Sequence, residues 1–159
     1  MAPSSELDPE KYEPDDQDGL PRELVGDWVQ DKQNLVARYV DISSAARRKY
    51  IGPKKAGATY IDLFSGPGRA RIRETSEVLD GSPLVAWHKS VEKNSPFSHL
   101  YIADANKGLL DACSIRLQKA SAPVKPLQGE ATVTIDQVVE SLHPDGLHFA
   151  FLDPYDLRS

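Results

Sequence analysis

From residue 60 onward, short apolar runs alternate with longer segments in which apolar residues recur at helical spacing. Short runs rich in aromatic and branched side chains are typical of buried strands. The predicted strands are 60–64, 98–104, 124–128 and 147–153, and the predicted helices are 105–119, 134–142 and one that begins at Gly81-Ser82-Pro83-Leu84. Regular alternation of this kind predicts right-handed βαβ units and an α/β fold with a mostly parallel sheet.

A further helical pattern precedes the first predicted strand. It begins after Pro21, ends before Gly52-Pro53 and predicts one long amphipathic helix. Its apolar positions follow one stripe, Leu24, Trp28, Leu35, Tyr39, Ile42 and Ala46. Large aromatic residues at helical spacing usually pack, so we expect Trp28 and Tyr39 to anchor this helix in the core.

The beginning of the chain has a different composition. Residues 1–19 combine several prolines with many acidic side chains, which predicts a flexible acidic tail. Residues 20–159 then form a single domain, and 40% hydrophobic residues are enough for a core. The net charge of -5 argues against a surface that coats nucleic acid broadly, although it permits a local basic patch. Arg69, Arg71 and Arg73 are candidates for such a patch, with solvated loop charges as the more ordinary interpretation.

Cysteine and histidine usage limits the chemistry. The single cysteine, Cys113, excludes an internal disulfide, and its place in an apolar helical stripe predicts a core position. The histidines lack metal-ligand spacing, so no metal site is expected. No signal peptide or membrane-spanning segment is evident, and we expect a soluble cytoplasmic protein without a membrane partner.

The first candidate site is the glycine turn, which we define as residues 65–68, directly after the strand 60–64. Gly66 and Gly68 can adopt positive φ, while Pro67 restricts its own φ, so the backbone can bend sharply and lie close to a ligand. Loops at the carboxyl ends of parallel strands bind cofactors in open α/β sheets. A tight turn without a ligand is the alternative, and the turn alone does not decide between them.

Acidic residues end the later strands. Asp104 follows the second strand, where a carboxylate can accept hydrogen bonds from ribose hydroxyls, or it caps the next helix. Glu130 follows the third strand and is either in the same cleft or an ordinary surface carboxylate. Asp153 follows the fourth, and Pro154 favours an extended Asp153 at the strand tip. Tyr155 could stack on a flat substrate group, whereas an ordinary Asp-Pro turn is the alternative.

In this order on alternating strands, Asp62-Leu-Phe-Ser-Gly-Pro-Gly68, Asp104, Gly129-Glu130 and Asp153-Pro-Tyr155 resemble a class I S-adenosylmethionine-dependent methyltransferase. The resemblance implies a Rossmann-like, three-layer α/β/α sheet and S-adenosylmethionine as cofactor. It assigns cofactor binding to six residues, namely Asp62, Phe64, Gly66, Gly68, Asp104 and Glu130. Asp153, Pro154 and Tyr155 are similar to the Asp-Pro-Pro-Tyr motif of amino-group methyltransferases, which implies that they hold the target amine.

A closer resemblance is to the three-Cys-motif partner proteins, a bacterial family often encoded beside a three-Cys-motif protein. The matching features begin at Trp28-Val-Gln-Asp-Lys32 and include Tyr60–Arg69, Gly81-Ser-Pro-Leu84 and Phe151-Leu-Asp-Pro-Tyr155. The likeness to this family implies the fold more than the reaction, and the Asp153-Pro-Tyr155 motif implies methyl transfer to an exocyclic amine of nucleic acid. The alternative function is a non-catalytic interaction partner of a three-Cys-motif protein that keeps the methyltransferase fold.

Four features of the sequence qualify the expectation. Arg71 occupies the position of the third glycine of a dinucleotide-binding loop, which disfavours an NAD enzyme. The terminal motif has one proline instead of two, and Cys113 is not in a Pro-Cys pair, which excludes cytosine-C5 chemistry. The chain also ends shortly after the fourth strand, so residues 20–159 are expected to be the N-terminal part of a methyltransferase-like domain, a fragment with an incomplete sheet.

Overall fold

The computed structural model describes residues 6–153 and contains a parallel four-stranded sheet at its centre. Its strands are β3 (Ala58–Asp62), β6 (His99–Asp104), β7 (Val124–Gln128) and β8 (Leu147–Ala150), in the spatial order β7-β6-β3-β8. All three neighbouring pairs are parallel. The sequence-based prediction of an α/β fold with these four strands is therefore confirmed. The direction of winding reverses between β3 and β8, where open α/β sheets place their ligand crevice.

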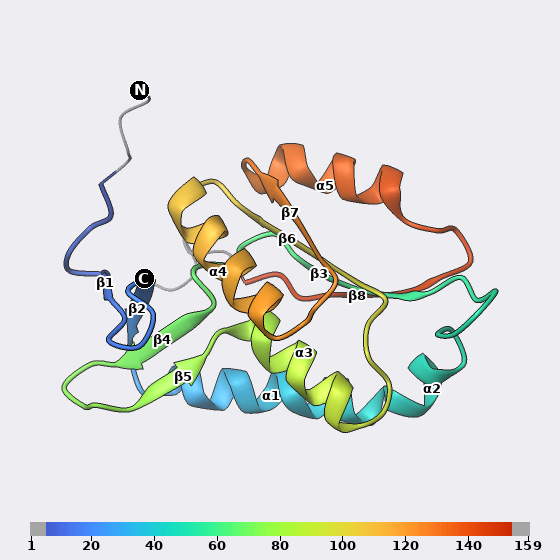
Figure 1. The fold of residues 1–159 in the computed structure, drawn as a ribbon, viewed down its shortest axis with the longest axis horizontal. Helices are drawn as coiled ribbons and strands as arrows, with labels where there is room; N and C mark the ends of the chain where they lie inside the picture. The colour runs from blue at the N-terminus through green and yellow to red at the C-terminus, as the bar shows by residue number, and fades with distance from the viewer. Residues whose placement is uncertain (1–5, 154–159) are drawn as a thin grey trace.

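Helices cover both faces of this sheet (Figure 1). One face packs against α1 (Trp28–Ile42), α3 (Ser82–Glu92) and α4 (Lys107–Lys119), and the other packs against α5 (Ala131–Ser141). The alternation of side chains along β3 serves both layers, because Tyr60 belongs to the first core and Ile61 to the second. A short helix, α2 (Ser44–Arg48), follows α1. Residue Cys113 lies fully buried in the first core, as predicted.

A second sheet, which the sequence did not predict, lies at one end of the molecule (Figure 1). Its strands are β1 (Tyr12–Pro14), β2 (Pro21–Val25), β4 (Arg69–Ile72) and β5 (Val78–Asp80), in the order β1-β2-β4-β5. The expectation of a helix from Pro21 is wrong, because β2 pairs in parallel with β4 instead. The polar stretch after the glycine turn is likewise a paired hairpin, in which β4 and β5 run antiparallel.

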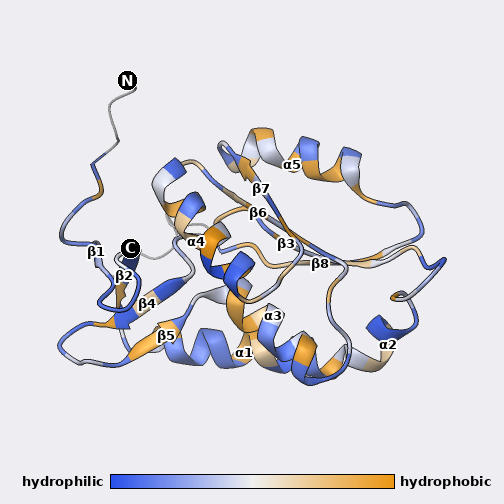
Figure 2. Ribbon diagram, viewed as in Figure 1, coloured by the Kyte–Doolittle hydropathy of each residue, from blue (hydrophilic) through white to orange (hydrophobic). Residues whose placement is uncertain are grey.

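The acidic segment differs from the expected flexible tail over the part that the structure describes. Tyr12–Pro14 pair antiparallel with β2, and the following acidic residues contact arginines of β2, β4 and α4. Figure 2 shows this segment and β4 mostly in the hydrophilic colour. The sequence argument counted only apolar burial, whereas opposite charges from distant segments hold these residues in place.

Helix α1 presents the opposite face from the one predicted. Trp28, Leu35, Tyr39 and Ile42 are between 49% and 70% exposed, so the expected core role of Trp28 and Tyr39 is wrong. The buried residues of α1 are Val29, Gln33, Val36 and Val40. Valines have short side chains and permit close packing of α1 against α3. This close packing decides which face of α1 is buried, although the aromatic residues on the other face are larger.

Two smaller points complete the fold. Helix α3 has Gly81 as its N-cap residue, and Pro83 lies in its first turn. Within residues 6–153, no helix is both long and apolar enough to cross a membrane.

Candidate functional site

Asp62 is the last residue of β3, and its side chain holds the backbone that leads into the glycine turn. Its carboxylate accepts hydrogen bonds from the amide of Phe64, at 3.0 Å, and from the hydroxyl of Tyr60, at 3.3 Å. The side chain is buried, and burial together with the Asp62 charge raises the pKa of Tyr60 well above its ordinary value. Tyr60 therefore stays a neutral hydrogen-bond donor, and Asp62 sets the direction in which the chain leaves the sheet.

The two glycines of the turn adopt positive φ, 60° at Gly66 and 84° at Gly68. A Cβ at Gly68 would lie 2.8 Å from Leu84 Cδ1 and 3.2 Å from Cys113 Sγ. Gly68 is therefore required for close packing of the turn against α3 and α4. The amide of Gly66 donates to Asp104 Oδ2 at 3.1 Å.

Asp104 links the second strand of the sheet to this turn. Besides the Gly66 amide, its carboxylate accepts the amide of Asn106 at 2.9 Å. Asn106 is the N-cap residue of α4, and its side chain accepts the amide of Leu109 at 3.1 Å. The interpretation of Asp104 as the helix cap is therefore wrong, because Asn106 has that role two residues later. Asp104 is instead a buried carboxylate at the carboxyl edge of the sheet.

A cavity of about 640 Å³ opens at the carboxyl ends of β3, β6 and β7. We call it the main cavity. Three of the sequence-predicted cofactor residues line it, Phe64, Asp104 and Glu130. The central part of the chain also contributes Leu63, Ala105, Asn106, Leu109, Gly129, Ala131 and Thr132. This volume is in the range of small-molecule sites, which are typically about 300–1,000 Å³.

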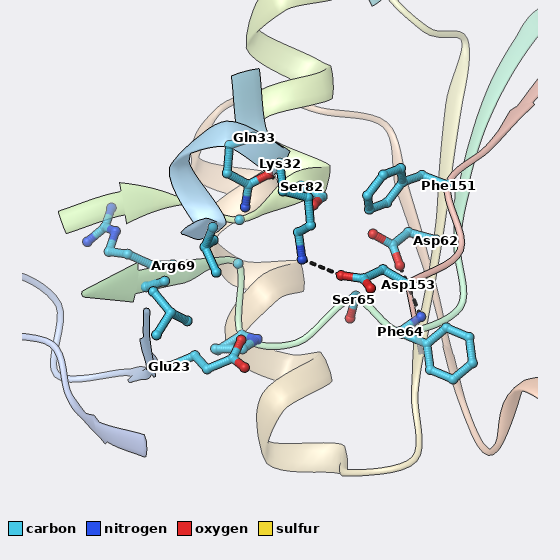
Figure 3. A pocket seen from close by; sticks show the side chains of 16 residues that line it. Glu23, Lys32, Gln33, Asp62, Phe64, Ser65, Arg69, Ser82, Phe151 and Asp153 are labelled. Atoms are coloured by element: carbon cyan, nitrogen blue, oxygen red, sulfur yellow. Dashed lines mark hydrogen bonds and ion pairs between the residues drawn. The ribbon is translucent and has the colours of Figure 1, made fainter. Parts of the chain in front are cut away.

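A much smaller pocket, of about 30 Å³, lies between α1, the glycine turn and the segments that follow β3 and β8 (Figure 3). Asp62, Phe64, Gly68 and Asp153 line it, which brings Asp153 close to the glycine turn. Gly66 lines neither cavity. Pro154 and Tyr155 lie outside the described residues.

Lys32 of α1 reaches into this smaller pocket and forms an ion pair with Asp153 (Figure 3). Both side chains are mostly buried there. Sequence reasoning missed Lys32 because its position was judged only against the apolar stripe of α1. In this arrangement an ammonium group occupies the position beside Asp153 that the sequence assigned to a substrate amine.

The arginines that follow the turn contact the acidic segment. Arg71 forms hydrogen bonds with both carboxylate oxygens of Glu13, at 2.6 and 2.9 Å, and Arg69 donates to Asp15 at 3.2 Å. The Arg71 hydrogen bond, assisted by Arg22, lowers the pKa of Glu13 to about 2. Arg73 donates to the backbone carbonyl of Glu10. These partners are internal, so the geometry does not favour a phosphate-binding patch.

The remaining candidate chemistry is limited. Burial raises the pKa of the Cys113 thiol, so this residue is an unreactive part of the core. Among residues 6–153, no group of three His, Cys, Asp or Glu side chains is placed to hold a metal ion.

Comparison of the chain with protein-family models, with curated proteins and with solved structures gave no match.

Proposed function

We propose that the main cavity binds S-adenosylmethionine and that the protein is a methyltransferase-like member of the three-Cys-motif partner family, acting on an exocyclic amine of nucleic acid. The observation that carries the proposal is the position of the main cavity. It lies at the carboxyl ends of three neighbouring parallel strands, with Asp104 at the end of β6 and Glu130 two residues after β7.

The residues of the main cavity suit this cofactor. Carboxylates are good acceptors for the two hydroxyls of a ribose, and Asp104 at the end of β6 and Glu130 after the neighbouring β7 supply them. Leu63, Phe64 and Leu109 provide apolar surface for a flat base. When bound, the cofactor supplies an electrophilic methyl group on a sulfonium ion.

Asp153 has the role of holding the acceptor amine in the proposed reaction. Its carboxylate accepts a hydrogen bond from the amine and takes up the proton that the nitrogen loses when it gains the methyl group. Alignment of this kind is worth about 7–11 kcal/mol in well-oriented reactions. Because Lys32 is paired with Asp153, the amine has to displace the Lys32 ammonium first. Pro154 and Tyr155 are proposed to border the base that carries the amine.

Thermal unfolding with and without S-adenosylmethionine tests the cofactor. Ligand at 100 times its dissociation constant adds about 2.7 kcal/mol to the free energy of unfolding and raises the melting temperature. Glu130→Ala should reduce this shift, because Glu130 is an exposed side chain that lines the cavity. Glu140→Ala, at the other end of α5, is the matched control and should leave the shift unchanged. A cooperative melt without any shift would refute the proposed cofactor.

A second candidate function, a non-catalytic partner of a three-Cys-motif protein, is favoured by one observation. The stripe of Trp28, Leu35, Tyr39 and Ile42 is exposed along α1, and exposed apolar patches often mark protein interfaces. Co-expression with a three-Cys-motif protein and size-exclusion chromatography tests this candidate. A stable complex that is lost in Leu35→Lys supports it, whereas cofactor binding without any complex favours the enzyme.

A further inference from the structure

The acidic N-terminal segment forms one wall of the main cavity. We call residues 6–18 the arm. Five of its residues line the cavity together with Phe64, Asp104 and Glu130, namely Glu6, Leu7, Asp8, Lys11 and Tyr12. The arm thus faces the carboxyl edge of the sheet, although more than 50 residues separate Tyr12 from Phe64 in the sequence.

Backbone hydrogen bonds and ion pairs hold the arm in one register. Tyr12 is opposite Glu23 in the β1–β2 pair, and the amide of Leu24 donates to the carbonyl of Lys11 at 2.8 Å. Beyond the strand, Asp15 accepts hydrogen bonds from Arg22 and Arg69. The Asp15 side chain is only 1% exposed. Burying a charge costs several kcal/mol, which the ion-pair partners have to offset. The buried Asp15 carboxylate with its two arginines is therefore a specific attachment of the arm.

Arg116 of α4 joins the arm directly to the glycine turn. Its Nε and Nη2 atoms each donate to the carboxylate of Asp18 at 2.9 Å. Its Nη1 atom donates to the carbonyl of Pro67, in the glycine turn, at 2.8 Å. The guanidinium is buried, and a planar fork of donors holds a carboxylate and a carbonyl in fixed relative positions. The position of the arm and the shape of the turn are therefore set by the same side chain.

We infer that the arm is part of the ligand site, and that Leu7 and Tyr12 contact the nucleoside part of the bound ligand. This inference rests on the proposed function, in which the main cavity holds S-adenosylmethionine. Both side chains line the main cavity and are half-buried. Part of the apolar surface of each therefore stays accessible to a ligand in that cavity. A leucine and an aromatic ring suit a flat base, which gains from apolar contact and stacking.

Isothermal titration calorimetry with S-adenosylmethionine and the chain of residues 1–159 tests the inference. Tyr12→Ala should weaken binding about tenfold, a value at the lower end of what loss of a base–aromatic contact produces. Tyr39→Ala removes the same side chain from the exposed face of α1 and is the matched control, with unchanged affinity. If Tyr12→Ala and the unaltered chain bind equally well, the arm is not part of the site, while the proposed cofactor stands. If the unaltered chain does not bind, the proposed cofactor is overturned and this inference with it.

A second variant guards against loss of the fold. Leu7 precedes β1, so Leu7→Ala leaves the strand pairing intact, and it should also weaken binding several-fold. Leu35→Ala on α1 is its control. Hydrogen exchange provides a readout that needs no activity, since ligand should slow exchange of the Leu24 amide, which donates to Lys11. Unchanged exchange in a chain saturated with ligand, together with full affinity of Leu7→Ala, would overturn the inference.

Discussion

Lys32 and Asp153 form an ion pair although 121 positions separate them in the sequence. Lys32 is on the first helix, and Asp153 follows the last strand that the structure describes. Both side chains line the pocket beside the glycine turn, where Asp153 is proposed to hold the substrate amine. The pair also connects α1 to the end of β8, so it contributes both to the fold and to the state of the proposed site.

The energy of this pair can be measured with a double-mutant cycle. We expect Lys32→Ala and Asp153→Ala each to lower the free energy of unfolding by about 1–2 kcal/mol, between the values of exposed and fully buried pairs. The double variant should lose less than the sum of the two, because each single change leaves the partner charge without its counterion. Urea denaturation of the four proteins gives the coupling energy. If the losses in unfolding free energy of the two single variants simply add in the double variant, the ion pair does not stabilise the protein.

Removal of Asp18 should destabilise the protein strongly. Asp18→Ala leaves the Arg116 guanidinium buried without its carboxylate, which costs about 3 kcal/mol or more. Arg48, exposed on α2, donates to the carbonyl of Lys93, and Arg48→Ala should cost less than about 0.5 kcal/mol. Denaturant titrations compare the two. Equal effects would indicate that the Arg116 contacts add little to stability.

Stability should also depend on acid pH through the arm. The hydrogen bond from Arg71 lowers the pKa of Glu13 from 4.5 to about 2, and Arg116 lowers the pKa of Asp18. At a pH between the unfolded and the folded pKa of each carboxyl group, the unfolded chain binds more protons than the folded chain. The free energy of unfolding therefore falls as the pH decreases from about 5 to about 2. For Glu13 the loss is at most about 3 kcal/mol, and solvent reduces it because 24% of the side chain is exposed.

Glu13→Gln provides the test of this pH dependence. Its unfolding free energy should be lower than that of the unaltered chain at pH 7, and the difference should disappear near pH 2. Glu140→Gln on α5 is the control and should follow the unaltered chain at every pH. Parallel profiles for Glu13→Gln and the unaltered chain would show that the Arg71 contact does not hold the arm.

The two faces of α1 should respond differently to truncation. Val40 is fully buried, and Val40→Ala is expected to cost about 2 kcal/mol. Ile42 is 70% exposed, and Ile42→Ala should change the free energy of unfolding by less than about 0.5 kcal/mol. Thermal or urea denaturation distinguishes them. A larger loss at Ile42 would mean that the stripe predicted from the sequence is the buried one after all.

Some parts of the candidate site followed from sequence, and others depended on packing. The positions of Phe64, Asp104, Glu130 and Asp153 at strand ends were predictable, because parallel strands bring their carboxyl ends to one edge. Lys32 and the residues of the arm were not, since they reach the site from other layers. The burial of Arg116 was predictable from the local pattern, because Arg116 lies three residues after Cys113 and so falls on the buried stripe of α4.

By itself, the sequence determined the strands of the central sheet and the helices between them. The spacing of apolar residues that distinguishes a strand from a helix is visible within a short stretch of chain. It predicted β7 with its observed bounds and placed β6 and α4 within a few residues of their observed ends. Tertiary structure decided which face of α1 is buried, that residues 12–14 and 21–25 are strands, and which acidic residue meets which arginine. These outcomes depend on shape and charge supplied by segments far away in the sequence, and no local pattern records that information.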